Sequence, residues 1–305
     1  MLAKQFACDQ TSGPRLRLRG RHSRGANETV AFARQGSKFI EFTKWGKAVS
    51  KSEWNPTAYG RFRDLRLRPA IDLIRGITAW NGGDIVDLGC GAGNVGQFLR
   101  DAFSPDRVMG VDSSASMLKK AREAEVFDAL FEADISTWEP PAPVGMIFSN
   151  AALQWVPDHR KLLPKLVEML AVGGVLAVQM PCQNNAPSHR VWRSLVEEMF
   201  PGRVDPKAGP AVLEAAAYFH LLEPLGKLSL WETEYYQILE PSDNDHPVRK
   251  FTEATVARPI LDALDAGERT ALIAEYEAVM EKAYPRVEGG HVLFPFRRLF
   301  FTVNR

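Results

Sequence analysis

The sequence has few cysteines and no long hydrophobic run. Its three cysteines, Cys8, Cys90 and Cys182, are scattered, with no C-x-x-C pair and no nearby histidine cluster. This pattern argues against a disulfide framework or a metal site and fits a reducing cytosol. No stretch approaches the roughly 18 uncharged apolar residues that a membrane span needs. We therefore expect a cytoplasmic protein without a membrane partner.

Neither sign of charge dominates the whole chain, because the net charge is +1 at pH 7. However, residues 1–53 carry 11 Lys+Arg and 4 Asp+Glu, whereas the remaining 252 residues carry 27 and 33. The run "RLRLRGRHSRG" at 15–25 suits a nucleic-acid-binding arm or an arginine-rich transit peptide. Because the segment lacks sustained apolar periodicity, we instead expect a disordered extension, or a translation start placed too far upstream. We expect it to have no catalytic role and no nucleic-acid partner.

From Trp54 onward, helical and strand patterns alternate. Apolar runs predict strands at 84–88, 108–112, 129–134, 144–150 and 175–180. Amphipathic segments between them predict helices, so the order is βαβ with a parallel sheet. Two later strand patterns, at 228–239 and 297–303, flank a mostly helical stretch. We predict one α/β domain at 54–305 with a Rossmann-like, mostly parallel seven-stranded sheet, helices on both faces and a helical insert at about 246–284.

The stretch "DLGCGAGNVG" at 87–96 fits two cofactor patterns. Gly91, Gly93 and Gly96 form G-x-G-x-x-G, which is typical of dinucleotide binding. Starting instead from Asp87, the motif D-x-G-x-G-x-G uses Gly89, Gly91 and Gly93 and is typical of S-adenosylmethionine (SAM) methyltransferases. In this second register Gly96 lies in the following helix and permits close packing.

Polar residues at the strand ends favour the second register, because ligands of open α/β sheets bind beyond the carboxyl ends of the strands. Asp87 suits an ammonium group and would repel a pyrophosphate on the helix N-terminus. Asp112 can accept ribose hydroxyl groups in either cofactor class. Asp134 can accept a hydrogen bond from the adenine amine, and Asn150 begins the loop that faces the methionine portion. Together these residues favour SAM.

Several segments carry a closer resemblance to a known family. The chain resembles class I SAM-dependent methyltransferases and, within them, trans-aconitate 2-methyltransferases, from Trp54 to Arg305. The segments are "WNPTAYGRF" (54–62), "RLRPAIDLI" (66–74), "NAALQWVPDH" (150–159), "GGVLAVQMP" (173–181) and "RRLF" (297–300). The resemblance implies that SAM methylates a carboxylate of trans-aconitate, giving the monomethyl ester and S-adenosylhomocysteine. A carboxylate is ionised at neutral pH, so this reaction needs no general base and no metal.

The site residues follow from the motifs and the resemblance. Expected cofactor-binding residues are Asp87, Gly89, Gly91, Gly93, Asp112, Ser113, Met117, Asp134, Ile135, Asn150 and Arg68. A small polycarboxylate substrate calls for arginine forks and hydrogen-bond donors. Expected substrate-binding residues are Tyr59, Trp155, Tyr236, Arg258, His291 and Arg298. Alternation along a strand sends Arg297 and Arg298 to opposite faces, and likewise Tyr235 and Tyr236, so at most one of each pair can serve.

Other functions remain open at this point. The acceptor of a carboxyl methyltransferase could be another small polycarboxylate or a carrier-bound acyl acid. A NAD(P)-dependent dehydrogenase would use the register that begins at Gly91. A non-catalytic module with the SAM fold could use the basic segment to bind nucleic acid. The sequence does not determine the oligomeric state.

Overall fold

The computed structural model describes residues 33–35, 38–40, 67–205, 209–242, 244–253 and 255–305. Contacts divide the chain into two units, Met1–Ser50 and Lys51–Arg305. In the first unit, the described backbone is the antiparallel pair of β1 (Ala33–Gln35) and β2 (Lys38–Ile40). The rest of the predicted 1–53 extension lies outside the described residues. The boundary at residue 53 therefore stays a prediction.

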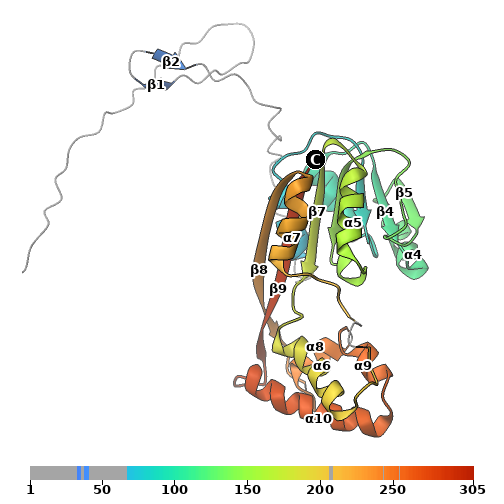
Figure 1. Ribbon diagram of the computed structural model, residues 1–305, viewed down its shortest axis with the longest axis vertical. Coiled ribbons are helices and arrows are strands. Elements are labelled where there is room, and N and C mark those ends of the chain that lie inside the picture. Colours follow the sequence, from blue (N-terminus) through green and yellow to red (C-terminus); the bar gives the residue numbers. More distant parts are fainter. Residues whose placement is uncertain (1–32, 36–37, 41–66, 206–208, 243, 254) are drawn as a thin grey trace, which may run out of the picture. The chain divides into compact units, whose positions relative to one another are not determined.

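The second unit contains a seven-stranded sheet with the order β5-β4-β3-β6-β7-β9-β8 (Figure 1). Strands β5 to β7 are parallel, and β9 is antiparallel to both β7 and β8. The strands are β3 (Ile85–Leu88), β4 (Val108–Asp112), β5 (Ala129–Glu132), β6 (Val144–Asn150), β7 (Leu170–Pro181), β8 (Lys227–Leu239) and β9 (Val292–Asn304). Because β3 lies between β4 and β6, the strand order reverses at its carboxyl end, where such sheets bind ligands. The predicted Rossmann-like fold is confirmed.

Helices cover both faces of this sheet. One face packs against α2 (Arg68–Gly76) and α3 (Gly96–Phe103), and the other against α5 (His159–Glu168) and α7 (Ala215–Leu222). Helix α4 (Ala115–Glu123) contacts β4 and β5. Two short 3-10 turns, η1 (Leu153–Trp155) and η2 (Glu223–Leu225), complete the connections. Both apolar layers are therefore buried, as a parallel sheet requires.

The remaining helices form the insert, with a core of its own. They are α6 (Pro187–Met199), α8 (Pro247–Glu253), α9 (Arg258–Asp262) and α10 (Ala266–Ala283). Trp192 of α6 stacks on Tyr276 of α10, with ring centroids 3.7 Å apart. The sequence predicted only the stretch 246–284, because α6 lies some fifty residues earlier and joins the insert through tertiary packing. In Figure 1 the insert lies at the bottom, where the parallel strands end and where β8 and β9 extend to it.

Two strands are longer than their sequence patterns predicted. Strand β7 begins at Leu170, five residues before the predicted start at 175, because the pair β6–β7 continues through a register shift. Strand β9 begins at Val292, since it pairs with β8 along all 13 residues. Both extensions lengthen the ladder without changing the strand order.

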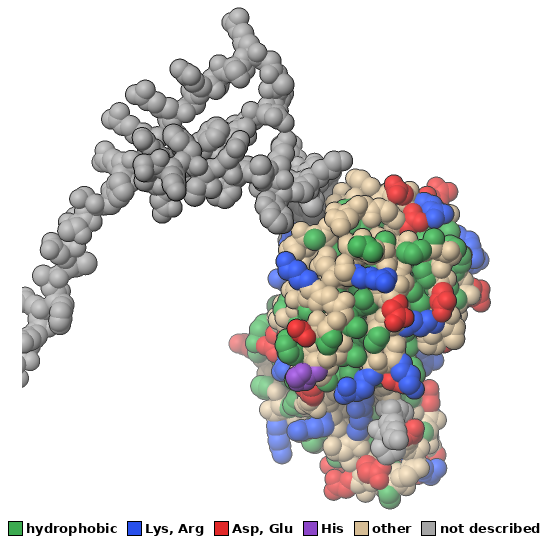
Figure 2. Space-filling model, turned by 45° about the horizontal axis from the view of Figure 1, so that its top comes forward, with side chains coloured by type: hydrophobic (Ala, Val, Ile, Leu, Met, Phe, Trp, Pro, Cys, Tyr) green, Lys and Arg blue, Asp and Glu red, His purple; other side chains and the backbone are tan. Residues whose placement is uncertain are grey.

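Figure 2 shows Lys/Arg and Asp/Glu side chains near one another on the visible face of this second unit. Among the described residues, no helix is long and apolar enough to span a membrane.

Candidate active site

Strand register places four polar side chains on one face of the sheet, near the carboxyl ends of the parallel strands. Asp87 of β3 is paired with Phe148 of β6, so both side chains lie on the face covered by α2 and α3. Two residues further along β6, Asn150 is paired with Gln179 of β7. Arg298 of β9 is paired with Pro181, the last residue of β7, so its side chain lies on the same face of the sheet as that of Gln179. The four residues therefore form a polar row across four neighbouring strands, β3, β6, β7 and β9.

Three of these residues carry buried polar atoms without a hydrogen-bond partner. The atoms are Asp87 Oδ2, Asn150 Oδ1 and Gln179 Nε2. Burial, together with the nearby carboxylate of Asp112, raises the pKa of Asp87 to about 7. Leaving buried polar groups unpaired costs free energy, and such groups concentrate where a ligand completes their bonding.

The glycine turn that follows β3 adopts backbone conformations that favour glycine. Gly89 has a φ of +81°, and a Cβ added there would lie 2.2 Å from the Cβ of Ala152. Gly91 has a φ of +54°, but an added Cβ would meet no atom within 4 Å. Gly89 thus lets the loop after β6 approach the turn, whereas Gly91 borders open space that a ligand can fill. Gly96, as predicted, packs closely, because its added Cβ would lie 2.7 Å from Val126.

Hydrogen bonds fix the carboxylates of Asp112 and Asp134, which end β4 and follow β5, and both can still accept further bonds. Asp112 accepts from the amides of Gly91 (2.9 Å) and Ser114 (2.8 Å), one bond to each oxygen. Asp134 accepts both the amide and the hydroxyl of Ser136 through Oδ1. These bonds lower the pKa of Asp134, which keeps it ionised. Each carboxylate oxygen has two lone-pair sites, so both acids can still accept bonds from a ligand.

The other expected cofactor residues surround this turn. Ser113 is exposed in the loop after β4, and Met117 is 41% exposed in the first turn of α4. The side chain of Ile135 lies next to Gly89, because its Cδ1 is 3.5 Å from the Cβ position there. An exposed methionine and a half-buried isoleucine after neighbouring strands can sandwich an adenine ring. The structure places Ile135 beside the turn, and the contact of all three residues with a cofactor stays a prediction.

These features fit SAM. The buried oxygens of Asp87 and Asn150 suit its methionine end, Asp112 suits the ribose, and Asp134 suits the adenine amine. The open space at Gly91 lets the ligand approach the backbone. A pyrophosphate would instead meet the carboxylate of Asp87 at the start of the glycine turn.

Arg298 is the residue best placed to bind an anion. It is 8% exposed, and the only hydrogen bond found for its guanidinium among the described residues is Nη1 to Oε1 of Gln179, at 3.2 Å. Its Cζ also lies 4.8 Å from the ring centroid of Phe296. Burial lowers the pKa of Arg298 to about 10, so it stays charged at neutral pH. A buried guanidinium next to a neutral amide is stabilised by an incoming carboxylate.

Arg68 lies on the same side of the molecule, at the start of α2. It is close to Asp72 (3.9 Å), and its Cζ is 5.3 Å from the ring centroid of Tyr235. The hydroxyl of Tyr235 donates to Asp72 at 2.8 Å. The structure therefore shows Arg68 in an ion pair, and its bond to the cofactor carboxylate stays a prediction. Trp155, 57% exposed in η1 after Asn150, can still form a wall of the site.

Three expected substrate residues are not brought to Arg298, and one lies outside the described residues. Tyr236 is on the opposite face of β8, where it is 60% exposed. Arg258 is a solvated residue of α9 that is paired with Asp262 at 3.8 Å. His291 precedes β9 and lies 3.3 Å from Glu240, about 23 Å from Arg298 at the usual rise per residue. The structure therefore does not place these three at the polar row, and their role stays a prediction, whereas Tyr59 lies outside the described residues.

Two residues of the polar face, Gln179 and Tyr235, were not among the expected site residues. Gln179 stands in the apolar run "VLAVQMP", where nothing but its polarity marks it. Of the neighbours Tyr235 and Tyr236, Tyr235 shares the face of Arg298, as its pairing with Phe296 shows. A buried polar residue within an apolar strand was the available signal for Gln179.

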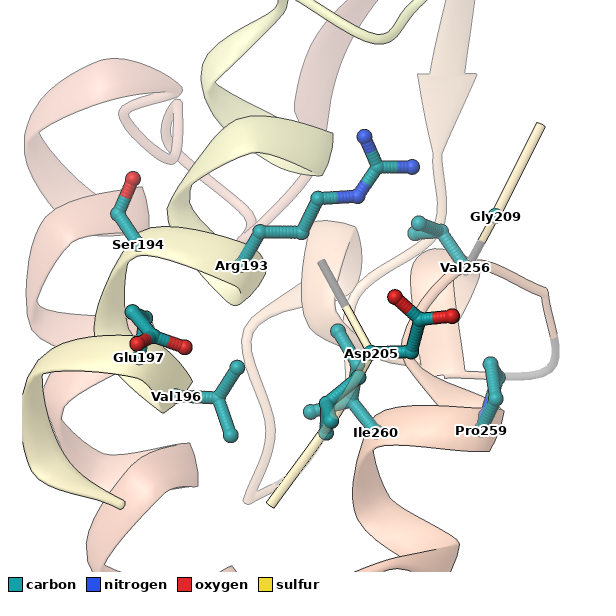
Figure 3. A pocket seen from close by; sticks show the side chains of 10 residues that line it. Arg193, Ser194, Val196, Glu197, Asp205, Gly209, Val256, Pro259 and Ile260 are labelled. Carbon is teal, nitrogen blue, oxygen red and sulfur yellow. The ribbon is translucent and has the colours of Figure 1, made fainter. Parts of the chain in front are cut away.

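Two cavities lie apart from the polar row. One, of about 260 Å³, lies in the insert; it is lined by Arg193 and Val196 of α6 and by Ile260 of α9, among others (Figure 3). The other, of about 250 Å³, lies on the opposite sheet face and includes Arg297 and Glu232. Two further glutamates line this second cavity, which makes it unsuited to a polycarboxylate. Neither cavity is lined by any of the expected site residues.

Comparison with known proteins agrees with this geometry. A family model described as a methyltransferase domain matches residues 85–174. Trans-aconitate 2-methyltransferase from Azoarcus sp. (strain BH72) is 41% identical over 253 residues, which cover 83% of this chain and 99% of the relative. The enzyme of the same name from Escherichia coli O1:K1 / APEC is 39% identical over 258 residues, with the same coverage.

Among solved structures, the YcgJ protein from Bacillus subtilis has a TM-score of 0.53 at 13% identity, covering 78% of this chain and 98% of that protein. This likeness concerns the fold alone. The match extends over 99% of the length of each named relative. The chain belongs to the trans-aconitate 2-methyltransferase family, within the SAM-dependent methyltransferases.

Proposed function

We propose that this protein transfers the methyl group of SAM to a carboxylate of trans-aconitate, giving a monomethyl ester and S-adenosylhomocysteine. The observation that carries the proposal is Arg298, a buried guanidinium without an anionic partner among the described residues, in the same row as Asp87 and Asn150. The names of the relatives supply the acceptor.

The chain's own residues bind and align the reactants. SAM, when bound, supplies an electrophilic methyl group. Asp87, ionised as the ammonium group approaches, would hold the methionine end, while Asp112 and Asp134 would hold the nucleoside. The acceptor carboxylate is already a nucleophile at neutral pH, so no side chain needs to remove a proton. Orientation and partial exclusion of water then provide the acceleration.

Incubation with methyl-labelled SAM and a panel of di- and tricarboxylates tests the proposal. We expect base-labile label on trans-aconitate, well above the label on cis-aconitate, isocitrate and citrate. Arg298→Met should raise the KM for trans-aconitate about 10- to 100-fold while the Kd for SAM stays within about twofold, because a charge-assisted carboxylate contact is lost. Label transferred only to a carrier-bound acyl acid would refute the assignment.

A further inference from the structure

The side chain of Gln179 has an orientation that its neighbour determines. Arg298 carries only hydrogen-bond donors, so the Gln179 atom that lies 3.2 Å from its Nη1 must be the amide oxygen. The amide nitrogen consequently points elsewhere. It is fully buried, and no described residue accepts a hydrogen bond from it.

The nitrogen of Gln179 and the guanidinium of Arg298 together form a set of donors without an anion. Gln179 is 0% exposed and Arg298 is 8% exposed, so water does not solvate them as it would surface groups. Buried donors of this kind strongly favour a carboxylate, which can accept from both. We propose that Gln179 is a substrate-binding residue, and that its amide nitrogen and Arg298 together hold a carboxylate of the acceptor that is not methylated.

The choice of a non-reacting carboxylate follows from the chemistry. Donation from a guanidinium withdraws charge from an oxygen and weakens it as a nucleophile. A carboxylate that stays unmodified keeps its charge throughout the reaction, so it can anchor the molecule without slowing the transfer. The inference rests on the proposed function and adds a specificity rule: a good acceptor needs a second carboxylate.

Two acceptors separate this role from a purely structural one. Crotonate has one carboxylate, whereas trans-aconitate has three. Gln179→Met keeps the volume of the side chain but removes the donor. We expect the KM for trans-aconitate to rise about tenfold with kcat changed less than about twofold, and kcat/KM for crotonate to stay within about twofold of the parent value.

A second variant tests the pairing with Arg298 directly. Gln179→Glu places a carboxylate beside the guanidinium, so the site carries its own anion. We expect a higher thermal midpoint in the ligand-free protein, a loss of trans-aconitate binding of more than about 100-fold in calorimetric titration, and a Kd for SAM within about threefold. Gln237→Met, at another buried glutamine, on β8, serves as the matched control and should change none of these values.

Two results would overturn the inference. One is an unchanged KM for trans-aconitate in Gln179→Met; the other is an equal loss with trans-aconitate and crotonate, which would indicate a structural role. If the parent protein methylates a different polycarboxylate and ignores trans-aconitate, the proposed function fails instead. The same comparison, made with that acid against a monocarboxylate, then tests Gln179 separately.

Discussion

Replacing Asp87 with asparagine should stabilise the ligand-free protein and weaken its binding of SAM. Burial raises the pKa of this carboxyl from 3.8 to about 7. At 1.36 kcal/mol per pKa unit, the shift of about three units corresponds to about 4 kcal/mol that the ionised group costs the folded state. The folded protein thus binds the proton more tightly than the unfolded chain does.

The pH dependence follows from the sign of this shift. Because the pKa is raised on folding, the stability that Asp87 contributes is complete below about pH 4 and is lost as the pH rises to about 7. Asparagine has no charge to lose, although its buried amide costs about 1–3 kcal/mol. We expect Asp87→Asn to gain roughly 1–3 kcal/mol in the free energy of unfolding at pH 8, and to lose roughly 1–3 kcal/mol at pH 4, where Asp87 is protonated and only the cost of the buried amide remains.

Urea unfolding of the ligand-free protein at pH 4, 6 and 8 measures the first effect, and calorimetric titration with SAM measures the second. The Kd for SAM should rise about 10- to 100-fold, because the ammonium group loses a charge-assisted partner. Asp101→Asn, at an exposed acid of α3, is the control and should change neither value. A variant that is less stable than its parent at pH 8, or that binds SAM equally well, would refute the reasoning.

Three further substitutions test other parts of the structure. Gly89→Ala should lower the free energy of unfolding by at least about 2 kcal/mol and weaken SAM binding. The reason is that the backbone of Gly89 is left-handed and an added Cβ would lie 2.2 Å from the Cβ of Ala152. Urea unfolding measures the stability, and calorimetric titration measures the binding of SAM. Glu277→Gln should cost about 1–2 kcal/mol in the same unfolding assay, since Glu277 accepts a 2.7 Å bond from the buried guanidinium of Arg249 in the insert. Arg258→Ala should leave the KM for trans-aconitate within about twofold, and a larger rise would return Arg258 to the site.

The positions of the residues expected to bind the cofactor could be predicted from the sequence because their signals are local. One short apolar strand ends at Leu88, directly after Asp87, and the next ends at Asp112. The glycines that follow the first strand must turn, so the motif and the strand order indicate the same place. Close contacts such as that between Gly89 and Ala152 lie within one pair of neighbouring strands. Periodicity over a few residues suffices for this part.

The substrate half depends on contacts between distant segments. Gln179 and Arg298 are 119 residues apart, and only the antiparallel register of β7 and β9 brings them together. Alternation shows that Arg297 and Arg298 face opposite ways, but not which of them faces the cofactor. Likewise, alternation separates Tyr235 from Tyr236 but does not show which of them shares a face with Arg298. A register shift of one residue would reverse both choices.

The order of the strands also separates two groups of proposed site residues along the chain. The residues proposed for the cofactor lie chiefly between Asp87 and Asn150, whereas Gln179 and Arg298 lie on the later strands β7 and β9. The two groups meet at the pairing of Asn150 with Gln179. Substitutions on β7 and β9 can therefore change the proposed acceptor contacts while the residues proposed to bind the methyl donor stay unchanged.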